Sequence, residues 1–173
     1  LDYKGQDFGQ YKNDESPTML VDSGKSTNGK GYEYGSLDYV GDIWEIDSSN
    51  ESFDAILCTE VFEHIPHPIK TLKEFSRLLK PSGKLILTLP SACLRHMDPY
   101  FFYSGFSDRW LEKFLTDSGF EINSIEPVGD YYSWLGVEMV RTFLANGIFA
   151  KLLLLPAVIY FRNKKKTLES TNT

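Results

Sequence analysis

FDAILCTEVFEHIPHP, residues 53–68, contains one predicted strand and the start of a predicted helix. The run 53–60 is mostly apolar, as expected of a strand buried on both faces. Pro68 suits the first turn of a helix, which the sequence Lys-Pro-Ser-Gly at 80–83 ends. Between them, apolar side chains recur at helical spacing: Ile69, Leu72, Phe75, Leu78 and Leu79. GKLILTLP (83–90) follows as a second buried strand, which completes a β-α-β unit.

The same alternation extends to both sides of this unit. Strands are predicted at 2–8, 37–46 and 120–129, and residues 9–36 are predicted to form a long loop. A helix is predicted at 107–118, with an inward face of Trp110, Leu111, Phe114 and Leu115. Strands that alternate with helices indicate an α/β fold with a mostly parallel sheet. Ligands of such sheets bind at the carboxyl ends of the strands.

Composition limits the class of protein. The chain has 173 residues, of which 42% are hydrophobic, enough for one domain with a core. Residues 1–140 hold 12 Lys/Arg against 23 Asp/Glu, and this acidic balance argues against nucleic-acid binding. The two cysteines, Cys58 and Cys93, make no disulfide framework, which favours a reducing, cytoplasmic location.

Polar residues gather at the predicted carboxyl ends of three strands: Asp7, Asp42 and Cys58-Thr59-Glu60. The segments GDIWEI, SFDAILCTEVFEHIPHP, EFSRLLKPSGKLILTLP and a later SGF follow one another in an order that resembles the class I S-adenosylmethionine-dependent methyltransferases, type 11 branch. The resemblance covers roughly residues 2–130. It implies a Rossmann-like, mostly parallel sheet and S-adenosyl-L-methionine as the cofactor.

The resemblance also implies the roles of the strand-end residues. Asp7, with Phe8 beside it, matches the position that binds the cofactor's ribose, and Asp42 with Ile43 matches the adenine position. Cys58, Thr59 and Glu60 match the strand end that borders the methionine half. The alternative is that Asp7 and Asp42 are turn and capping residues, as aspartates commonly are.

The stretch 91–110 is predicted to cover the acceptor side. It contains His96, the candidate general base, and Tyr100 and Tyr103, which together with His64 are candidate acceptor contacts. An aromatic cluster that fixes the loop is the alternative. A sulfonium methyl is already activated, so the main requirement is in-line positioning of the acceptor, here a small molecule, a glycan or a lipid-linked compound.

No metal site is predicted. His64 and His67 are three residues apart, but Pro66 lies between them and Pro68 follows, so the pair does not lie on one regular element. His96 is the only other histidine, and Glu60 and Glu63 leave oxygen ligands available, so the alternative stays open. In the simpler interpretation, Glu63 and His64 hold the loop that enters the helix by hydrogen bonds, and His67 occupies the helix cap.

The glycine-rich loop of the family's first strand is missing. No strand followed by G-x-G-x-G occurs, so the sheet is predicted to lack its first strand and helix in this chain, and the chain alone is predicted to bind the cofactor poorly. We expect either a protein that extends upstream of Leu1 or a truncated product. A non-catalytic methyltransferase-like binding module is the alternative function, and another doubly wound nucleotide-dependent enzyme is disfavoured.

The chain is predicted to divide into an incomplete methyltransferase-like domain at 1–140 and a C-terminal segment at 141–173. Residues 143–161 are nearly all apolar and would extend about 28 Å as a helix. Basic residues follow at 162–166, which favours peripheral contact with the inner face of a membrane. Packing on the domain or on a dimer partner, and a full span, are the alternatives; the sequence does not determine the oligomeric state.

Overall fold

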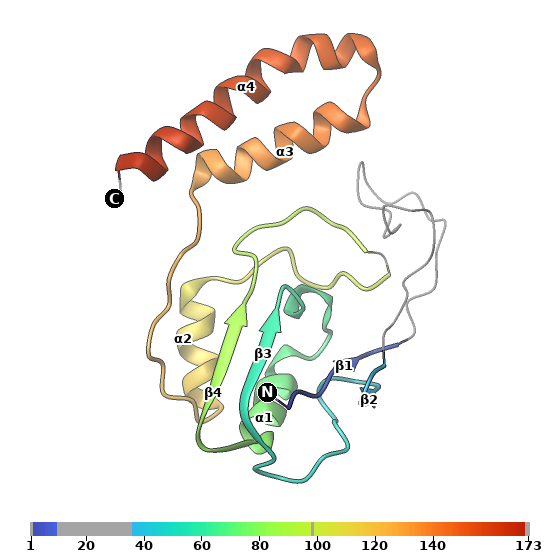
Figure 1. Cartoon of the computed structure of the whole chain (residues 1–173), viewed down its shortest axis with the longest axis vertical. Coiled ribbons are helices and arrows are strands. Elements are labelled where there is room, and N and C mark those ends of the chain that lie inside the picture. Colours follow the sequence, from blue (N-terminus) through green and yellow to red (C-terminus); the bar gives the residue numbers. More distant parts are fainter. Residues whose placement is uncertain (1, 10–35, 98, 172–173) are drawn as a thin grey trace. The chain divides into compact units, whose positions relative to one another are not determined.

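The structure is a computed structural model that describes residues 2–9, 36–97 and 99–171. It divides into two compact units, the first holding the described residues up to Ser124 and the second those from Ile125 onward (Figure 1). The predicted loop at 10–35 lies outside the described residues.

A parallel β-α-β unit forms the centre of the first unit. Strands β3 (Phe53–Thr59) and β4 (Leu79–Thr88) pair in parallel and are connected by helix α1 (Pro68–Leu78). His67 occupies the N-cap of α1, as predicted, although its side chain makes no capping hydrogen bond. The strand β4 begins directly after α1, four residues before the predicted start. The predicted α/β class with parallel strands is confirmed.

A second parallel pair is shorter than expected. β1 (Gln6–Asp7) pairs with β2 (Tyr39–Val40), where strands were predicted over 2–8 and 37–46. The pairing ends at Gly41, whose φ is 141° and whose N–H donates to the carbonyl of Asp7. A turn follows at once, because the N–H of Glu45 donates to the carbonyl of Asp42.

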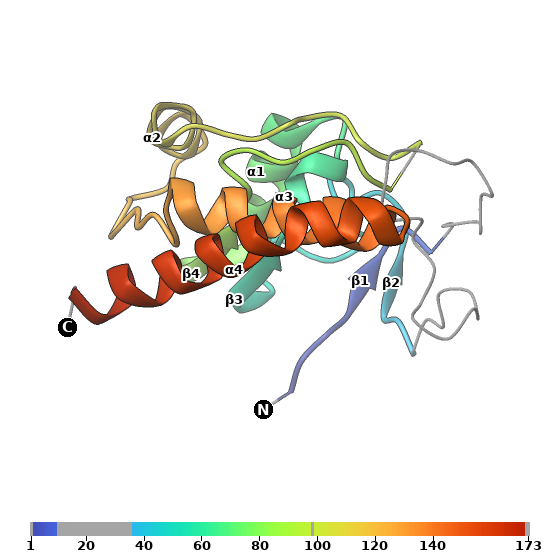
Figure 2. The ribbon, with the colours of Figure 1, turned by 90° about the horizontal axis from the view of Figure 1, so that it is seen from above.

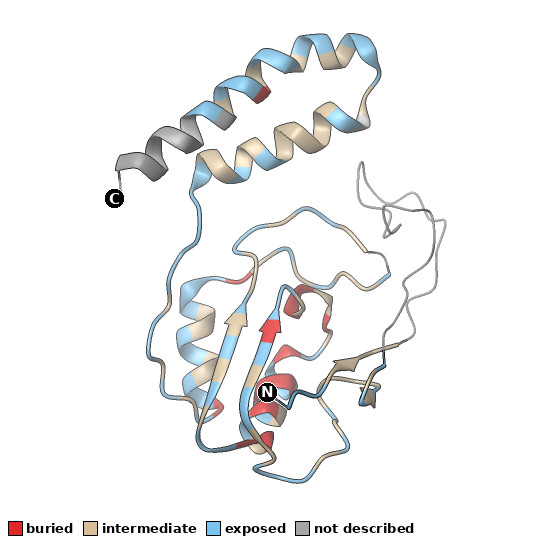
Figure 3. Cartoon of the chain, viewed as in Figure 1, coloured by how far each residue is buried: buried red, intermediate tan, exposed pale blue. Residues whose placement is uncertain are grey.

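The core lies between the sheet and α1, around the short 3₁₀ helix η1 (Phe62–His64) (Figure 3). Its buried members are Cys58, Phe62, Ile65, Leu72, Phe75 and Phe106. Ile69, which was counted among the apolar residues at helical spacing, lies outside the core and is 39% exposed. The reason is geometric: Ile69 lies about 120° around the helix from Phe75, outside the apolar stripe.

The sheet is covered on one face. Figure 2 shows α1 and α2 (Asp108–Asp117) on the same side of β3 and β4. Trp110, Phe114 and Leu115 of α2 pack against the core, and Ser107 caps the helix by accepting from the N–H of Trp110. On the other face Leu57 is 69% and Ile86 56% exposed. The prediction of strands buried on both faces is therefore wrong for the described part of this unit.

The strand predicted at 120–129 is absent from the described chain. The N–H of Phe120 instead donates to the carbonyl of Leu115 and closes the end of α2 after Gly119. A strand needs a partner edge for its backbone groups, and residues 121–129 pair with no described strand. Pro127 also lacks an N–H donor, and Val128 is fully exposed.

The second unit is a pair of packed helices, α3 (Tyr131–Ala145) and α4 (Ile148–Thr171). Asp130 caps α3 by accepting from the N–H of Ser133. Gly136 permits the close approach, since a Cβ there would lie 3.5 Å from the Cβ of Phe161. The domain boundary predicted at 140/141 falls inside α3, and the domain organisation stays a prediction. Within the described residues, no helix combines the length and the apolarity that crossing a membrane requires.

Candidate functional site

A cavity of about 440 Å³ opens in the first unit, a size typical of small-molecule sites. Both strand pairs contribute to its wall, together with the turn after β2 and residues around η1. The lining residues include Gln6, Asp7, Phe8, Asp42, Ile43, Trp44, Ile56, Cys58, Thr59, His64, Tyr100 and Phe102.

Most of the predicted ligand-binding residues meet in this wall, and three do not. Glu60, Tyr103 and His96 lie outside the lining. The carboxylate of Glu60 accepts a hydrogen bond from the Thr88 hydroxyl at 3.0 Å, and the Tyr103 hydroxyl donates to the carbonyl of Pro66 at 3.4 Å. The strand-end rule therefore places residues at the cavity more reliably than it assigns which side chain points inward.

Asp7 has a turn role as well as its place in the cavity wall. Its Oδ1 accepts from the N–H of Gly9 at 2.8 Å, an Asx-type turn at the end of β1. A carboxylate has two oxygens, so the turn role and a ligand role are compatible. Phe8 stacks edge-on against Tyr100 with ring centroids 5.5 Å apart, which connects β1 to the loop at 91–106.

The last turn of α1 holds the segment that follows Asp42. Glu74 Oε1 accepts from the N–H of Ile46 at 2.8 Å, and Arg77 donates to the carbonyls of Ile46 and Ser48 at 3.0 and 2.7 Å. Arg77 also bonds Glu74 at 2.7 Å, and this hydrogen bond lowers the pKa of the Glu74 carboxyl. The Glu74–Arg77 pair thus fixes one wall of the cavity.

Cys58 is a neutral part of the wall. Burial raises the pKa of its thiol from 9.0 to about 12, and the negative charge of Glu63 adds to the shift. The thiol therefore stays protonated at neutral pH, which argues against a nucleophile or a thiolate ligand at this position.

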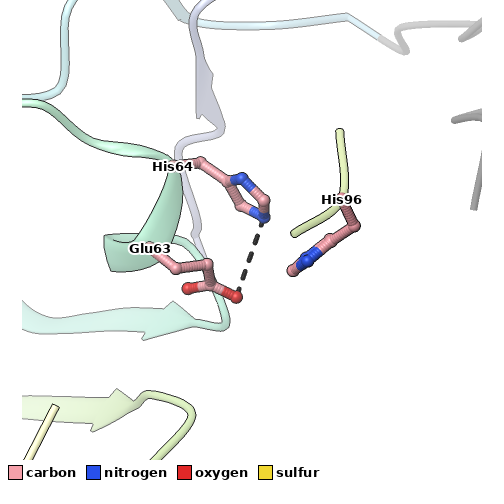
Figure 4. Close-up of side chains that lie close together, drawn as sticks. All are labelled: Glu63, His64 and His96. Atoms are coloured by element: carbon pink, nitrogen blue, oxygen red, sulfur yellow. Dashed lines mark ion pairs between the residues drawn. The ribbon is translucent and has the colours of Figure 1, made fainter. Parts of the chain in front are cut away.

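His64 ties the loop at 91–106 to η1. Its Nδ1 donates to the carbonyl of Tyr100 at 2.5 Å, while the carbonyl of Glu63 accepts from Phe102 and Tyr103 at 2.8 and 3.2 Å. These bonds connect η1 to the loop at 91–106, whereas the predicted role of Glu63 and His64 in the loop that enters α1 stays a prediction. His96 packs edge-on against His64, with ring centroids 4.7 Å apart (Figure 4).

The aromatic residues of the loop divide between two environments. Tyr103, Phe106 and Trp110 form a cluster, with successive ring centroids 5.2 and 4.8 Å apart. Tyr100 and Phe102 instead line the cavity. The sequence prediction missed Phe102 and Trp44 as cavity residues. Trp44 packs against His67, with ring centroids 5.1 Å apart. The position of Trp44 just after a strand end, in GDIWEI, was the signal that could have identified it.

Comparison with known proteins finds one family model and several relatives that are similar to part of the chain. Residues 9–87 match the family model of the methyltransferase domain, type 11. Ubiquinone biosynthesis O-methyltransferases are similar over 37 residues: that of Xanthomonas oryzae pv. oryzae is 51% identical and that of Xanthomonas axonopodis pv. citri 49%. These matches cover 21% of this chain and 16% of each relative, so the chain spans only a small part of their length.

A solved structure is also similar. Phosphoethanolamine N-methyltransferase 2 of Haemonchus contortus, in complex with phosphomonomethylethanolamine and S-adenosylhomocysteine, is 21% identical with a TM-score of 0.47. The match covers 75% of this chain and 33% of that one.

The described fold and the family match lead to one classification. The parallel β-α-β unit is part of a Rossmann-like sheet, and residues 53–87 of it lie inside the matched region. Residues 9–87 are similar to the type 11 methyltransferase domain, which belongs to the class I S-adenosylmethionine-dependent methyltransferases. The resemblance noted in the sequence is confirmed.

Proposed function

We propose that the protein containing this chain transfers a methyl group from S-adenosyl-L-methionine to an acceptor, and that the cavity of the first unit holds the cofactor. The observation that carries the proposal is the convergence of Asp7, Asp42 and the end of β3 on one cavity. These residues come from three separate strand ends, where the ligands of parallel sheets bind.

Each part of the cofactor has a candidate partner in the wall. Asp7 accepts from the ribose hydroxyls, and Asp42 accepts from the adenine amino group, with the backbone of Ile43 beside it. Cys58 and Thr59 border the methionine half as neutral groups. Carboxylates suit the first two roles because hydrogen bonds to charged acceptors are stronger than those to neutral ones.

The acceptor is proposed to enter on the side of Tyr100 and His64. The O-methyltransferase name of the relatives favours an oxygen acceptor, from a small molecule, a glycan or a lipid-linked compound. An oxygen acceptor has to lose a proton, and His96, which lies outside the lining but packs against the cavity residue His64, is the candidate base. The donor's sulfonium needs no further activation, so positioning is the chain's main contribution.

A non-catalytic binding module is the second candidate. The observation that favours it is the lack of a G-x-G-x-G run after any strand in this sequence. Methyl transfer by the protein to a candidate acceptor would exclude this second function, whereas cofactor binding without transfer to any tested acceptor would support it.

Calorimetry on the full-length protein tests the cofactor site. Loss of a hydrogen bond to a charged acceptor costs about 1.5–3 kcal/mol, so Asp7→Ala and Asp42→Ala should each weaken S-adenosylmethionine binding by about 10- to 150-fold. Asp54→Ala is the matched control, because its side chain is 85% exposed and pairs with Lys80 outside the cavity. Unchanged affinity in both cavity variants would refute the assignment.

We also propose that the second unit contacts a membrane surface. Its helices expose large apolar side chains, among them Phe149 and Leu153 at 81% and Leu152 at 62%. Basic residues follow in the sequence at 162–166. Apolar area together with cations is what favours attachment to an anionic bilayer.

A further inference from the structure

Three side chains able to bind a metal ion meet beside the cavity: Glu63, His64 and His96. One potential ligand atom of each lies within 4.8 Å of the other two, and Glu63 Oε1 is 3.7 Å from His64 Nε2. Figure 4 shows the three side chains converging, two from η1 and one from the loop at 91–106. The fold brings these residues together, since 32 positions separate His64 from His96 in the sequence.

Hydrogen bonds orient both imidazole rings for coordination. The Nδ1 of His64 faces the carbonyl of Tyr100 at 2.5 Å, and the Nδ1 of His96 faces the carbonyl of Leu94 at 2.8 Å. A carbonyl oxygen only accepts, so each Nδ1 carries the hydrogen. In the neutral ring Nε2 then keeps its lone pair. Histidines that bind metals almost always donate their other nitrogen in this way.

Glu63 supplies a buried negative group. Its side chain is only 3% exposed, and among the described residues its Oε2 has no hydrogen-bond partner. Buried carboxylates are ordinarily paired or bound to a metal. Oε1 lies 3.7 Å from the Nε2 of His64, so a cation bound between these two atoms would be attracted to both.

We propose that Glu63, His64 and His96 bind a divalent transition-metal ion, with Zn²⁺ the best fit. Two imidazoles and one carboxylate, with a position left open, are a ligand set of zinc sites. Imidazole donors disfavour Mg²⁺ and Ca²⁺, which take oxygen ligands. Tetrahedral bonds of about 2.0–2.1 Å place ligand atoms about 3.4 Å apart. The half-buried His96 therefore has to move inward by roughly 1 Å.

The ion would lie at the edge of the cavity, because its ligand His64 and the neighbouring Tyr100 both line that cavity. A bound divalent ion lowers the pKa of a hydroxyl that occupies its open position. With the ion bound His96 is a ligand and not the base, and the ion takes over the activation of the acceptor hydroxyl. That consequence for an acceptor rests on the proposed function, whereas binding of the ion does not.

Competition titration with a chromophoric zinc chelator tests the site on chelator-treated, full-length protein at pH 7.5 without cofactor. One Zn²⁺ per chain is expected to bind. His96→Ala and Glu63→Gln should each weaken binding at least tenfold. His67→Ala is the matched control, because it removes the remaining histidine, whose ring packs on Trp44, and it should leave zinc affinity within twofold.

Folding is checked in every variant by circular dichroism and thermal melting. Bound Zn²⁺ should raise the melting temperature of the wild type but not that of the variants that lack a ligand. The proposal is overturned if the wild type binds no Zn²⁺ at stoichiometric concentrations, or if the folded His96→Ala protein binds as tightly as the wild type. Equal weakening by His67→Ala would also overturn it. Calorimetry with S-adenosylmethionine in the same metal-free protein reports the proposed function separately.

Discussion

Gly105 stands where the loop at 91–106 returns to its starting point. Its φ is 146°, and a Cβ at this position would lie 2.3 Å from the carbonyl oxygen of Ser91. The loop is closed there by two backbone bonds, from Cys93 to Ser104 at 2.7 Å and from Phe106 to Pro90 at 2.9 Å. The cavity residues Tyr100 and Phe102 therefore lie on a loop whose closure depends on Gly105.

Gly105→Ala should destabilise the protein more than Gly41→Ala. Both glycines have positive φ, 146° and 141°, so alanine is strained at both positions, but a Cβ at Gly41 meets nothing within 4 Å. Steric overlap of the added methyl group should increase the loss in free energy of unfolding at Gly105 by about 1–3 kcal/mol. Urea denaturation of the two variants measures the difference, and equal losses would show that the loop relaxes without cost.

Cys58 predicts a pH dependence of stability. Burial raises the pKa of its thiol from 9.0 to about 12, so the unfolded chain loses this proton first. The contribution of the Cys58 thiol to the free energy of unfolding is complete below pH 9. It falls as pH rises toward 12, by up to about 1.4 kcal/mol per pH unit. Chemical denaturation between pH 8 and 11 should show this slope in wild type and Cys93→Ala but a smaller one in Cys58→Ala. An identical slope in all three proteins would assign it to other groups.

At the scale of elements, the last turn of α1 holds the segment that follows β2 through hydrogen bonds. Arg77 should therefore matter more than its partial exposure suggests, because it bonds the carbonyls of Ile46 and Ser48 as well as Glu74. Arg77→Lys keeps the charge but loses the planar set of donors. We expect a loss of about 1–2 kcal/mol in stability and weaker cofactor binding.

Arg109→Lys is the control for that variant. Arg109 is 82% exposed and pairs only with Glu112 on its own helix among the interactions described, so its replacement should change stability by less than about 0.5 kcal/mol. Urea denaturation gives the stabilities and calorimetry the cofactor affinities. Similar small effects in both variants would show that the Arg77 bonds do not hold the turn after β2.

Local sequence predicted the elements whose signals are complete within a few residues. The start of α1 at Pro68 was predicted correctly, and the helix predicted at 107–118 is found at Asp108–Asp117. Strands at 2–8, 37–46 and 120–129 were predicted too long or wrongly, because a strand depends on a partner edge that its own sequence does not contain. The site shows the same dependence on distant parts of the chain. Strand ends predicted which residues line the cavity, whereas the contact between His64 and His96 depends on how a distant loop folds back.

At the scale of the whole molecule, the second unit differs from the first in what it exposes. Within α3 and α4, Val158 is buried and Tyr132 lies near Phe161 with ring centroids 6.5 Å apart, so the helices do share a packed seam. Other apolar side chains remain exposed, including Val137, Ile148, Ile159 and Tyr160, at 50–66%. One cation, Lys151, lies 5.9 Å from the ring of Phe143.

If these side chains contact a bilayer, full-length protein should sediment with vesicles that contain anionic lipid and should sediment less as salt rises, because screening weakens the attraction of the basic residues at 162–166. Phe149→Ser combined with Leu153→Ser should abolish sedimentation, since each burial of a large apolar side chain contributes about 1.5–3 kcal/mol. Leu57→Ser with Ile86→Ser, on the exposed sheet face of the first unit, is the matched control for apolar surface in general. Sedimentation that survives the α4 double variant, or none with the wild type at low salt, would instead make α3 and α4 a surface for protein packing, which sedimentation equilibrium would then report as a dimer.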